Sequence, residues 1–438
     1  MLRFILLLTF LPGFAPVFAQ TGYTLYATGD TSDFVTTAHQ PGLVLAGGGT
    51  DNDSAMVWML RRAAGGDVVV LRASGSDGYN SYFYSELGVS VHSVETIRFD
   101  NGTPANDPFV LRKIRNAEVL FFAGGDQHKY YSYWKDTPVE DAINYLINDK
   151  KITVGGTSAG MAILGEAYYV PPGSSLTTVQ ALGNPYHENI NILGYGGFVD
   201  APFMNNLITD THYDQRNRQG RHMTFMARLT HDYDIRAYGI ASNEHVAVCI
   251  DGNGLAWTFG DDNATDEYAY FLRGNCQPDA NPETCVANTP LTWNRQQAAV
   301  QAYKMPGSMQ PVHSFDLKDW QTASGGNWGN WSVNQGVLLK TANPDGDCDL
   351  LSSSVPLLPA TEGFRIFPNP AQQTFQIRSE RDETVHIALR DAFGRVIWDA
   401  GAVATNTSID VPGTLPQGVY YCLVRQGERK SVLRLVFL

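Results

Sequence analysis

The chain has 438 residues, which favours two or three domains. Its hydrophobic content of 43% and aromatic content of 11% exclude a wholly disordered protein. A net charge of −13 at pH 7 argues against a nucleic-acid-binding protein.

Residues 1–19 have the pattern of a secretory signal peptide rather than of a buried N-terminal helix. Arg3 supplies the positive charge, a short apolar run follows, and Val17 and Ala19 precede the predicted cleavage site between Ala19 and Gln20. The run is too short and too broken by proline to suit a membrane helix, and no other segment reaches about 18 apolar residues. No membrane span is therefore expected.

Between about Tyr23 and Tyr303, apolar strands alternate with helical segments. Strands are predicted in residues 42–49, 67–74, 91–99, 117–127 and 151–154, and helices in 51–66, 138–150 and 159–167. Asp51 or Asp53 is the expected N-cap of the first helix. This alternation predicts an α/β domain over residues 20–305, with a mostly parallel sheet and helices on both faces.

After Tyr303 the chain becomes rich in Gly, Asn and Trp, and residues 306–360 are predicted to be a β appendage or linker. Residues 361–438 contain short alternating strands separated by turn residues, which predicts a small β-sandwich. Its segments FRIFPNPA, LRDAFGRVI and LPQGVYYCLV resemble the C-terminal sorting domain of proteins exported by the type IX secretion system. The resemblance implies the secretion machinery as a partner and a bacterial outer-surface or secreted location. An ordinary adhesive β-sandwich is the alternative.

Export affects how the five cysteines are interpreted. Cys276 and Cys285 bracket a polar, turn-rich loop, so an oxidising compartment favours a disulfide between them. Cys249 lies in a strand-like segment and is expected to be buried. The sequence leaves the pairing of Cys348 and Cys422 open.

Gly156-Thr-Ser-Ala-Gly160 is a G-x-S-x-G motif between a predicted strand and a predicted helix. A sharp turn at this place would lift the Ser158 hydroxyl above the edge of the sheet. Ligands bind at the carboxyl ends of strands in such sheets, where Gly47–Gly49, Gly124–Gly125 and Gly155–Gly156 also lie. On the motif alone, Ser158 is as well explained as a structural turn residue as it is as a nucleophile.

His212 is the histidine with the most informative surroundings. It follows an apolar strand and precedes Arg216, Arg218 and Arg221. This pattern fits either a solvated basic helix face or a catalytic base beside a clamp for a substrate carboxylate.

Four segments, FFAGGDQ, GGTSAGMA, DTHYDQRNRQGR and YGIASNEHVAV, together resemble cyanophycinases and dipeptidase E-type serine peptidases. The resemblance extends from about Gly42 to Asp251. It implies a fold like that of class I glutamine amidotransferases. It also implies a serine peptidase, with residues 20–305 as its catalytic domain, that forms an acyl-enzyme and hydrolyses aspartyl peptide bonds in cyanophycin or β-aspartyl peptides. The signal peptide and the sorting domain make the expected peptidase a secreted one.

By this resemblance, Ser158 is the nucleophile, His212 the general base and Glu244 the acid that orients it. The substrate-binding positions are Gln127, Asp210, Arg216, Arg218 and Arg221. The chain departs from the family pattern at Thr211, at Met161 and in Ala241-Ser-Asn-Glu244, where the family has G-I-D-E. Met161 is expected to change packing or pocket shape near the elbow.

The oxyanion of the tetrahedral intermediate needs preorganised donors. The backbone N–H of Ala159 is expected to be one donor, and that of Gly124 or Gly125 the second. No nucleotide-binding loop and no metal-ligand spacing occurs in the sequence, so no cofactor and no metal are expected.

Two other functions remain to be weighed. An α/β-hydrolase esterase would place the acid before the histidine, whereas Glu244 follows His212 here. A catalytically inactive, surface-displayed binding protein on the same scaffold would explain the departures from the family pattern. The sequence is compatible with a homodimer and does not decide the oligomeric state.

Overall fold

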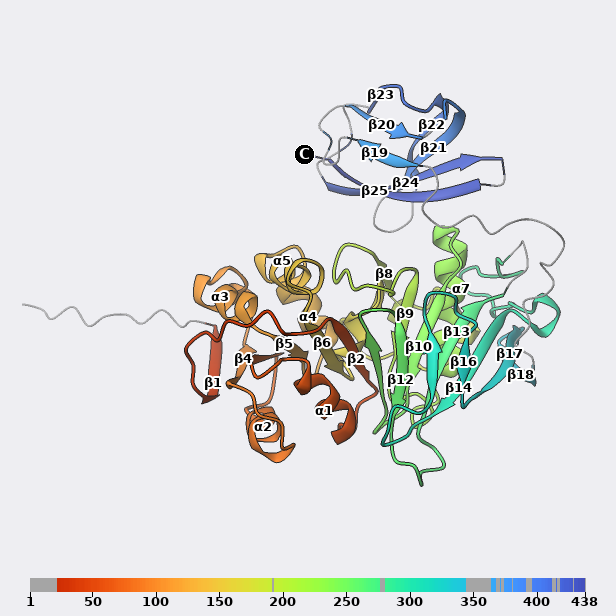
Figure 1. The fold of residues 1–438 in the computed structure, drawn as a ribbon. Helices are drawn as coiled ribbons and strands as arrows, with labels where there is room; N and C mark the ends of the chain where they lie inside the picture. Colours follow the sequence, from red (N-terminus) through yellow and green to blue (C-terminus); the bar gives the residue numbers. More distant parts are fainter. Residues whose placement is uncertain are drawn as a thin grey trace, which may run out of the picture.

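The computed structural model describes residues 22–190, 193–275, 280–343, 364–367, 371, 374–379, 381–390, 396–411, 415, 418–427 and 429–437. A ten-stranded sheet forms one side of the larger body (Figure 1). In order across this sheet, its strands are β1 (Tyr23–Gly29), β4 (Ser93–Phe99), β3 (Asp67–Arg72), β5 (Val119–Phe122), β6 (Thr153–Thr157), β2 (Gly42–Ala46), β11 (Ala247–Asp251), β12 (Leu255–Phe259), β15 (Ser314–Asp316) and β16 (Ala323–Ser324).

Parallel pairing is confined to the centre of this sheet, where β4, β3, β5, β6 and β2 run side by side. Strand β1 pairs antiparallel with β4, and β11, β12, β15 and β16 continue the other edge antiparallel. The expectation of a mostly parallel sheet is therefore wrong for the whole sheet and holds only for its middle. Of these edge pairs, β11 and β12 form a short hairpin, whereas β2 and β11 are far apart in the sequence, so their antiparallel pairing could not be predicted from local connections.

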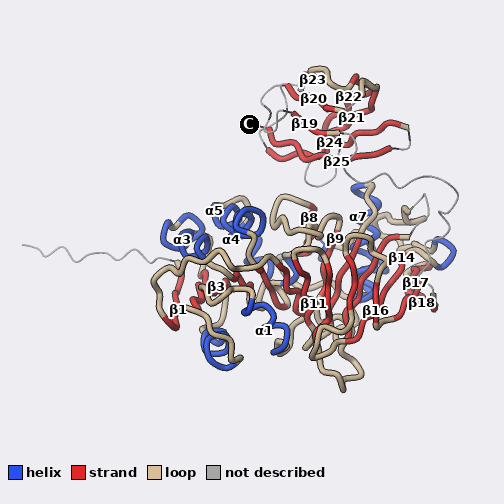
Figure 2. The backbone as a smooth tube through the Cα atoms, viewed as in Figure 1, coloured by secondary structure: helices blue, strands red, loops and turns tan. Residues whose placement is uncertain are grey.

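Helices cover both faces of the ten-stranded sheet (Figure 2). Helices α3 (Pro108–Asn116), α4 (Gln127–Trp134) and α5 (Pro138–Tyr145) lie on one face, and α1 (Asp53–Arg61) and α2 (Gly78–Ser81) lie on the other. Short helical turns adjoin three of these helices: Tyr82–Glu86 follows α2, Thr103–Asn106 precedes α3, and Leu146–Lys150 follows α5. The N-cap of α1 is Asn52, whose side chain accepts from the Ala55 N–H, so neither Asp51 nor Asp53 caps this helix.

The core beneath these helices includes the apolar residues of the helix predicted over residues 138–150. Val139, Ala142, Ile143 and Leu146 of the α5 segment are fully buried, because their spacing places them on one helical face. They join a cluster that also contains Val154 of β6. The strand that carries Ser158 is therefore held by packing from a helix as well as by its hydrogen-bond ladder.

A second, eight-stranded sheet completes the larger body. Its order is β18 (Val337–Ala342), β17 (Asn327–Asn334), β14 (Val300–Pro306), β13 (Tyr268–Gly274), β10 (Tyr238–Ser242), β9 (Leu207–Asp210), β7 (Ala167–Tyr169) and β8 (Leu193–Tyr195). Helix α7 (Gln219–Tyr233) packs on it with α6 (Thr178–Gly183), and short turns occupy Met161–Ile163, Glu188–Ile190 and Arg295–Gln297. The predicted appendage spans residues 306–360, of which 306–343 are described. These residues form β15 to β18, which extend both large sheets.

Two small sheets form the C-terminal body (Figure 1). One contains β19 (Arg365–Phe367), β20 (Thr374–Arg378) and β23 (Ile409–Asp410). The other contains β22 (Val396–Ala404), β21 (Thr384–Arg390), β24 (Gly418–Gln426) and β25 (Arg429–Phe437). Residues of both sheets, including Phe375 and Val424, share one apolar cluster, which is the packing that a β-sandwich would have.

The C-terminal body contacts the larger body near the end of α7. The Tyr421 hydroxyl donates to the Tyr195 carbonyl at 2.7 Å, and the Arg390 guanidinium donates to the Asp232 carbonyl at 2.6 Å. Arg425 lies 3.2 Å from the Asp234 carboxylate. Cations at a helix C-terminus are favourable because they face the negative end of its dipole.

Some expectations concern residues outside the described part of the chain. The signal peptide at 1–19, Cys276, Cys348 and the linker residues 344–360 all lie there, so the Cys276–Cys285 disulfide stays a prediction. Cys249, Cys285 and Cys422 are buried. Within the described residues, no helix combines the length and the apolar character needed to cross a membrane.

Candidate active site

Ser158 stands immediately after β6 in a left-handed backbone conformation, with φ of +51°. Such a conformation is costly for a residue with a side chain, and it produces the sharp elbow expected for a nucleophile. The flanking residues must be glycines because any side chain there would clash with neighbouring backbone atoms. A Cβ on Gly156 would lie 2.4 Å from the Gly160 carbonyl carbon, and one on Gly160 would lie 2.1 Å from the Phe122 carbonyl oxygen.

The segment after the elbow differs from the expected helix. Residues 161–163 make a single 3-10 turn, and the chain then enters β7 at Ala167. The chain turns here because β7 pairs with β9, and Gly165 lies against the Leu207 carbonyl, where a Cβ would approach to 2.6 Å. The predicted helix at 159–167 is therefore wrong, and no long helix begins at Ser158.

Ser158, His212 and Glu244 lie in one hydrogen-bonded line. The Ser158 hydroxyl is 2.7 Å from His212 Nε2, and His212 Nδ1 is 2.6 Å from Glu244 Oε1. The Glu244 carboxylate accepts only, so Nδ1 carries the proton and Nε2 presents its lone pair to the Ser158 hydroxyl. This tautomer is the one that a general base needs.

His212 is nearly buried, and Gly48 closes over its ring. A Cβ on Gly48, whose φ is +100°, would lie 2.4 Å from His212 Cε1, so only glycine fits there. Burial lowers the pKa of His212 below its usual value, the Glu244 hydrogen bond opposes this, and the charges of Arg216 and Arg218 lower it further. A lowered pKa keeps His212 neutral, and so able to accept a proton, at neutral pH.

The predicted oxyanion donors lie around Ser158. A Cβ on Gly124 would be 3.6 Å from the Ser158 Cβ, which places the end of β5 beside the elbow. The N–H of Ser158 itself donates to the Ala46 carbonyl at 2.9 Å. By contrast, the N–H groups of Ala159, Gly124 and Gly125 make no hydrogen bond to another described residue. They are therefore available to a ligand.

A pocket of about 230 Å³ opens in front of Ser158. Its lining includes the predicted residues Gly125, Gln127, Ala159, Asp210, Arg216, Arg218 and Arg221. It also includes Tyr169, Ser175 and Phe225, which the sequence did not single out because aromatic and turn residues there look like ordinary core and loop positions. Within the described residues, no group of three or more His, Cys, Asp or Glu side chains is arranged to hold a metal ion.

The three arginines occupy different environments. Arg221 is buried and donates to both oxygens of Asp210, with Nε to Oδ2 at 2.8 Å and Nη2 to Oδ1 at 2.5 Å. Its Nη1 donates to the Ser175 hydroxyl at 2.7 Å and to the Leu176 carbonyl. Four of its five N–H groups are thus occupied by the protein. Arg221 and Asp210 act chiefly as a framework beneath the pocket.

Arg218 differs from Arg221 because only one of its three side-chain nitrogen atoms donates to a described residue. Its Nη1 donates to the carbonyl and hydroxyl of Thr211, while its Nε and Nη2 donate to no described residue. Burial lowers the pKa of Arg218 to about 10, with the neighbouring Arg221 charge contributing, and the group stays protonated at neutral pH. Arg216 is about half exposed and lies 3.9 Å from Glu244. Gln127 Nε2 reaches the Tyr169 carbonyl only at 3.5 Å.

Met161 lies outside the pocket. It is fully buried in the large core cluster, and Ala162, the next residue, lines the pocket instead. Its carbonyl accepts from the Thr209 hydroxyl at 2.9 Å. Of the two effects expected of Met161, the structure therefore shows a contribution to packing, not to pocket shape.

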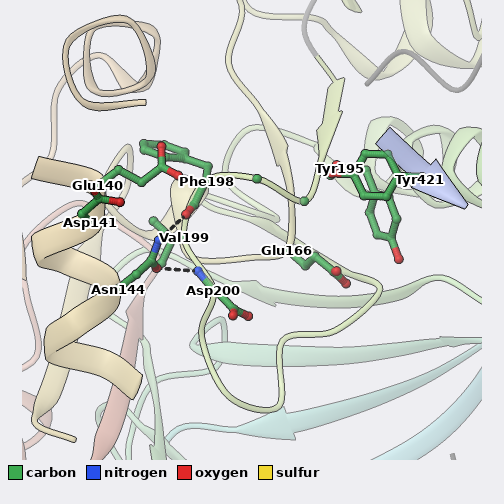
Figure 3. Close-up of a pocket in the computed structure, with 11 residues that line it drawn as sticks. Glu140, Asp141, Asn144, Glu166, Tyr195, Phe198, Val199, Asp200 and Tyr421 are labelled. Atoms are coloured by element: carbon green, nitrogen blue, oxygen red, sulfur yellow. Dashed lines mark hydrogen bonds between the residues drawn. The ribbon is translucent and has the colours of Figure 1, made fainter. Parts of the chain in front are cut away.

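A second, acidic pocket of about 380 Å³ lies between the two bodies (Figure 3). Glu140 and Asp141 of α5 face the loop after β8. Asn144, also in α5, binds this loop: its amide donates to the Phe198 carbonyl and accepts from the Asp200 N–H. Tyr421 of β24 closes one side beside Tyr195. Burial raises the pKa of Glu140 to about 7.

Comparison with protein families identifies two parts of the chain. Residues 73–257 match the model of peptidase family S51. The S51 match includes Ser158, His212 and Glu244 and ends within β12. Residues 365–437 match the secretion system C-terminal sorting domain, which indicates type IX secretion to the cell surface or outside the cell.

The curated relatives that the chain matches include cyanophycinases. A cyanophycinase from Synechococcus elongatus is 26% identical over 199 residues, which cover 42% of this chain and 58% of that protein. A cyanophycinase from Trichormus variabilis is 26% identical over 220 residues, which cover 50% of this chain and 66% of that protein. The chain thus spans about three fifths of the length of the curated relatives that it matches.

Two solved structures are similar over about half of the chain. A peptidase from an acI-B1 Actinobacterium is 14% identical, with a TM-score of 0.38, covering 53% of this chain and 91% of that one. A putative peptidase E protein from Listeria monocytogenes EGD-e is 16% identical, with a TM-score of 0.32, covering 51% of this chain and 100% of that one.

Proposed function

We propose that the chain is a secreted serine peptidase that hydrolyses aspartyl-containing peptide bonds, in cyanophycin or in β-aspartyl peptides. The observation that carries the proposal is the unbroken line from the Ser158 hydroxyl through His212 to Glu244, at 2.7 and 2.6 Å. The S51 match and the cyanophycinase relatives support the class of reaction.

In the proposed first step, His212 Nε2 takes the Ser158 hydroxyl proton while the serine oxygen bonds to the peptide carbonyl carbon. The carbonyl π electrons move to oxygen, and this oxyanion would be bound by the N–H of Ala159 and of Gly124 or Gly125. Glu244 stabilises the imidazolium that forms. Loss of one oxyanion donor typically costs about 3 kcal/mol in activation free energy.

The tetrahedral intermediate then collapses. The C–N bond breaks, His212 returns its proton to the leaving amine, and the acyl group stays on Ser158. A water molecule, deprotonated by His212, then attacks the acyl carbon. The C–O bond to Ser158 breaks, His212 returns the proton to the Ser158 oxygen, and the acid is released. Proton and electron balance need only the three side chains and water, so no step calls for a cofactor.

The charge of the pocket supports an acidic substrate. The lining contains three arginines and two aspartates: Arg216, Arg218, Arg221, Asp126 and Asp210. Asp210 is already paired with Arg221, and Asp126 caps α4. Arg218 retains two nitrogen donors directed to no described residue. Arginine binds carboxylates in bidentate fashion, so a substrate side-chain or terminal carboxylate is the group expected there.

The proposal is tested by incubating the purified protein with cyanophycin, with β-aspartyl dipeptides and with matched α-aspartyl dipeptides. Ser158→Ala is the control for contaminating peptidase. Turnover by the wild type and none by the variant is expected. If the wild type binds these substrates but turns over none of them, the chain is instead the inactive binding protein.

A further inference from the structure

The base and the acid of the proposed triad stand on two separate loops. His212 follows β9, and Glu244 follows β10, its parallel neighbour in the eight-stranded sheet. Both strands end before these residues, and His212 has a left-handed backbone with φ of +45°. The strand ladder therefore does not by itself hold the His212 ring against the Glu244 carboxylate.

Asp214 and Asn243 join these two loops by reciprocal hydrogen bonds. The Asp214 N–H donates to Asn243 Oδ1 at 3.1 Å, and Asn243 Nδ2 donates to Asp214 Oδ2 at 3.0 Å. Asn243 is fully buried and directly precedes Glu244, while Asp214 stands two residues after His212. The pair thus ties the base loop to the acid loop next to the functional side chains.

The surroundings of the pair favour the present polarity over the reversed one. The Tyr270 hydroxyl donates to Asp214 Oδ2 at 2.7 Å, and Gln219 Nε2 donates to Asp214 Oδ1. Asn243 Nδ2 also donates to the Asp266 carbonyl at 2.5 Å. Residue 214 is an acceptor here, so residue 243 must be a donor on that side.

This requirement explains a departure from the family pattern. The chain has Ser242-Asn243-Glu244 where the family pattern has I-D-E. An aspartate at 243 would set a buried carboxylate against both the Asp214 carboxylate and the Asp266 carbonyl. Like charges at such separation in a buried site are strongly unfavourable.

We propose that Asp214 and Asn243 are positioning residues that set the distance between His212 and Glu244, with Asn243 matched to Asp214. The kinetic side of this proposal rests on the proposed peptidase function. The pair touches no reacting atom and acts through the two loops. Displacements of about 1 Å in catalytic groups can cost on the order of 100-fold in rate.

The kinetic experiment uses the full chain and compares three variants with the wild type. Asn243→Asp is expected to lower kcat about 10- to 100-fold with KM changed less than about threefold. Adding Asp214→Asn restores a donor–acceptor match with reversed polarity, and kcat is expected to recover at least about fivefold. Recovery is partial because the Asp266 carbonyl loses its donor. Asn253→Asp, an exposed position with the same change of charge, should leave kcat unchanged.

A second measurement needs no substrate. The His212 Nδ1 proton, held by Glu244, should give a downfield proton NMR resonance that disappears in His212→Gln. The resonance is expected to weaken or move in Asn243→Asp and to return in the double variant. If Asn243→Asp does not fold, Asp214→Ala is measured in its place and is expected to lose the resonance.

The two measurements separate the two proposals. No turnover by the wild type, with the NMR changes present, would contradict the peptidase function and leave the positioning role standing. An unchanged resonance and kcat in folded Asn243→Asp would overturn the positioning role. A loss of kcat that the double variant does not recover, with a parallel fall in Tm, would also overturn it, because stabilisation of the loops alone would account for that result.

Discussion

Arg221 donates to both carboxylate oxygens of Asp210, and this buried pair forms the floor of the pocket in front of Ser158. Arg218 lies 3.7 Å from the same carboxylate but keeps two nitrogen atoms directed to no described residue. Two arginines three residues apart therefore have different tasks. One holds the framework, and the other is free to bind a carboxylate.

Substitution of the two arginines should separate these tasks. Arg221→Ala removes both charge-assisted hydrogen bonds of the buried Asp210 and leaves Arg218, at 3.7 Å, as its nearest cation, which should reduce the free energy of unfolding by about 3 kcal/mol. Arg218→Ala leaves the Asp210–Arg221 pair intact, so it should raise KM at least about tenfold with little change in Tm. Thermal unfolding and steady-state kinetics on both variants check this. Equal destabilisation by both would assign Arg218 to the framework as well.

The proposed triad predicts graded losses of activity. Ser158→Ala should reduce kcat by on the order of 10⁴-fold or more, since the nucleophile and the base act as a unit. Glu244→Gln keeps the shape of the side chain but removes the charge that stabilises the imidazolium, and about 10²- to 10⁴-fold loss is expected. Both variants should unfold at temperatures near that of the wild type. An active Ser158→Ala would exclude Ser158 as the nucleophile.

The pH dependence of kcat/KM should have its acid limb below pH 6.5. His212 is active when neutral, and burial lowers its pKa, so activity should persist to lower pH than an exposed histidine would allow. The positive charge of Arg216 contributes to this lowering. Arg216→Ala should therefore move the midpoint of the acid limb to higher pH. A midpoint that moves to lower pH would contradict the assignment of His212 as base.

Burial of His222 should make the stability of the protein depend on pH. It is fully buried in α7, its Nδ1 faces the Tyr213 hydroxyl at 3.1 Å, and its Nε2 faces the Ile208 carbonyl at 3.2 Å. Burial lowers the pKa of His222 to about 4, so the unfolded chain binds more protons between pH 4 and pH 6.5. Stability should thus be full above pH 6.5 and fall by about 3 kcal/mol as pH drops to 4.

Unfolding of the wild type and of His222→Gln between pH 4 and pH 7 tests this dependence. Glutamine keeps a donor for the Ile208 carbonyl but does not titrate. The variant should lose less stability than the wild type over this interval, and an equal loss in both would assign the acid sensitivity to other groups.

The elbow should tolerate no side chain at Gly160. A Cβ there would lie 2.1 Å from the Phe122 carbonyl oxygen, which is backbone and cannot move aside cheaply. Gly160→Ala should therefore lower both stability and activity. Gly173→Ala is a matched control in the pocket lining, because a Cβ there meets no atom within 4 Å. Normal folding of Gly160→Ala would show that the loop relaxes.

Local sequence was enough for much of this protein. The apolar period of Val139 to Leu146 and the apolar runs of β2 to β6 predicted the helices and strands of the central sheet, because burial selects these patterns directly. Strand ends marked by glycine located Ser158 and Gly124, which the structure brings together. The sorting domain was predicted from the order of its own segments and is confirmed.

Only the tertiary structure decided which of the candidate residues serve the site and which support it. Arg218 and Arg221 look alike in the chain, and their difference arises from the position of Asp210 on a neighbouring strand. The 3-10 turn after Ser158 replaces a helix that local propensity favours, since β7 must reach β9. Asn243 could be seen as a departure from the family, but its reason lies in Asp214, on a loop that meets it only when β9 and β10 are paired. Propensity acts along the chain, whereas charge pairing and steric exclusion depend on residues that folding alone brings within reach.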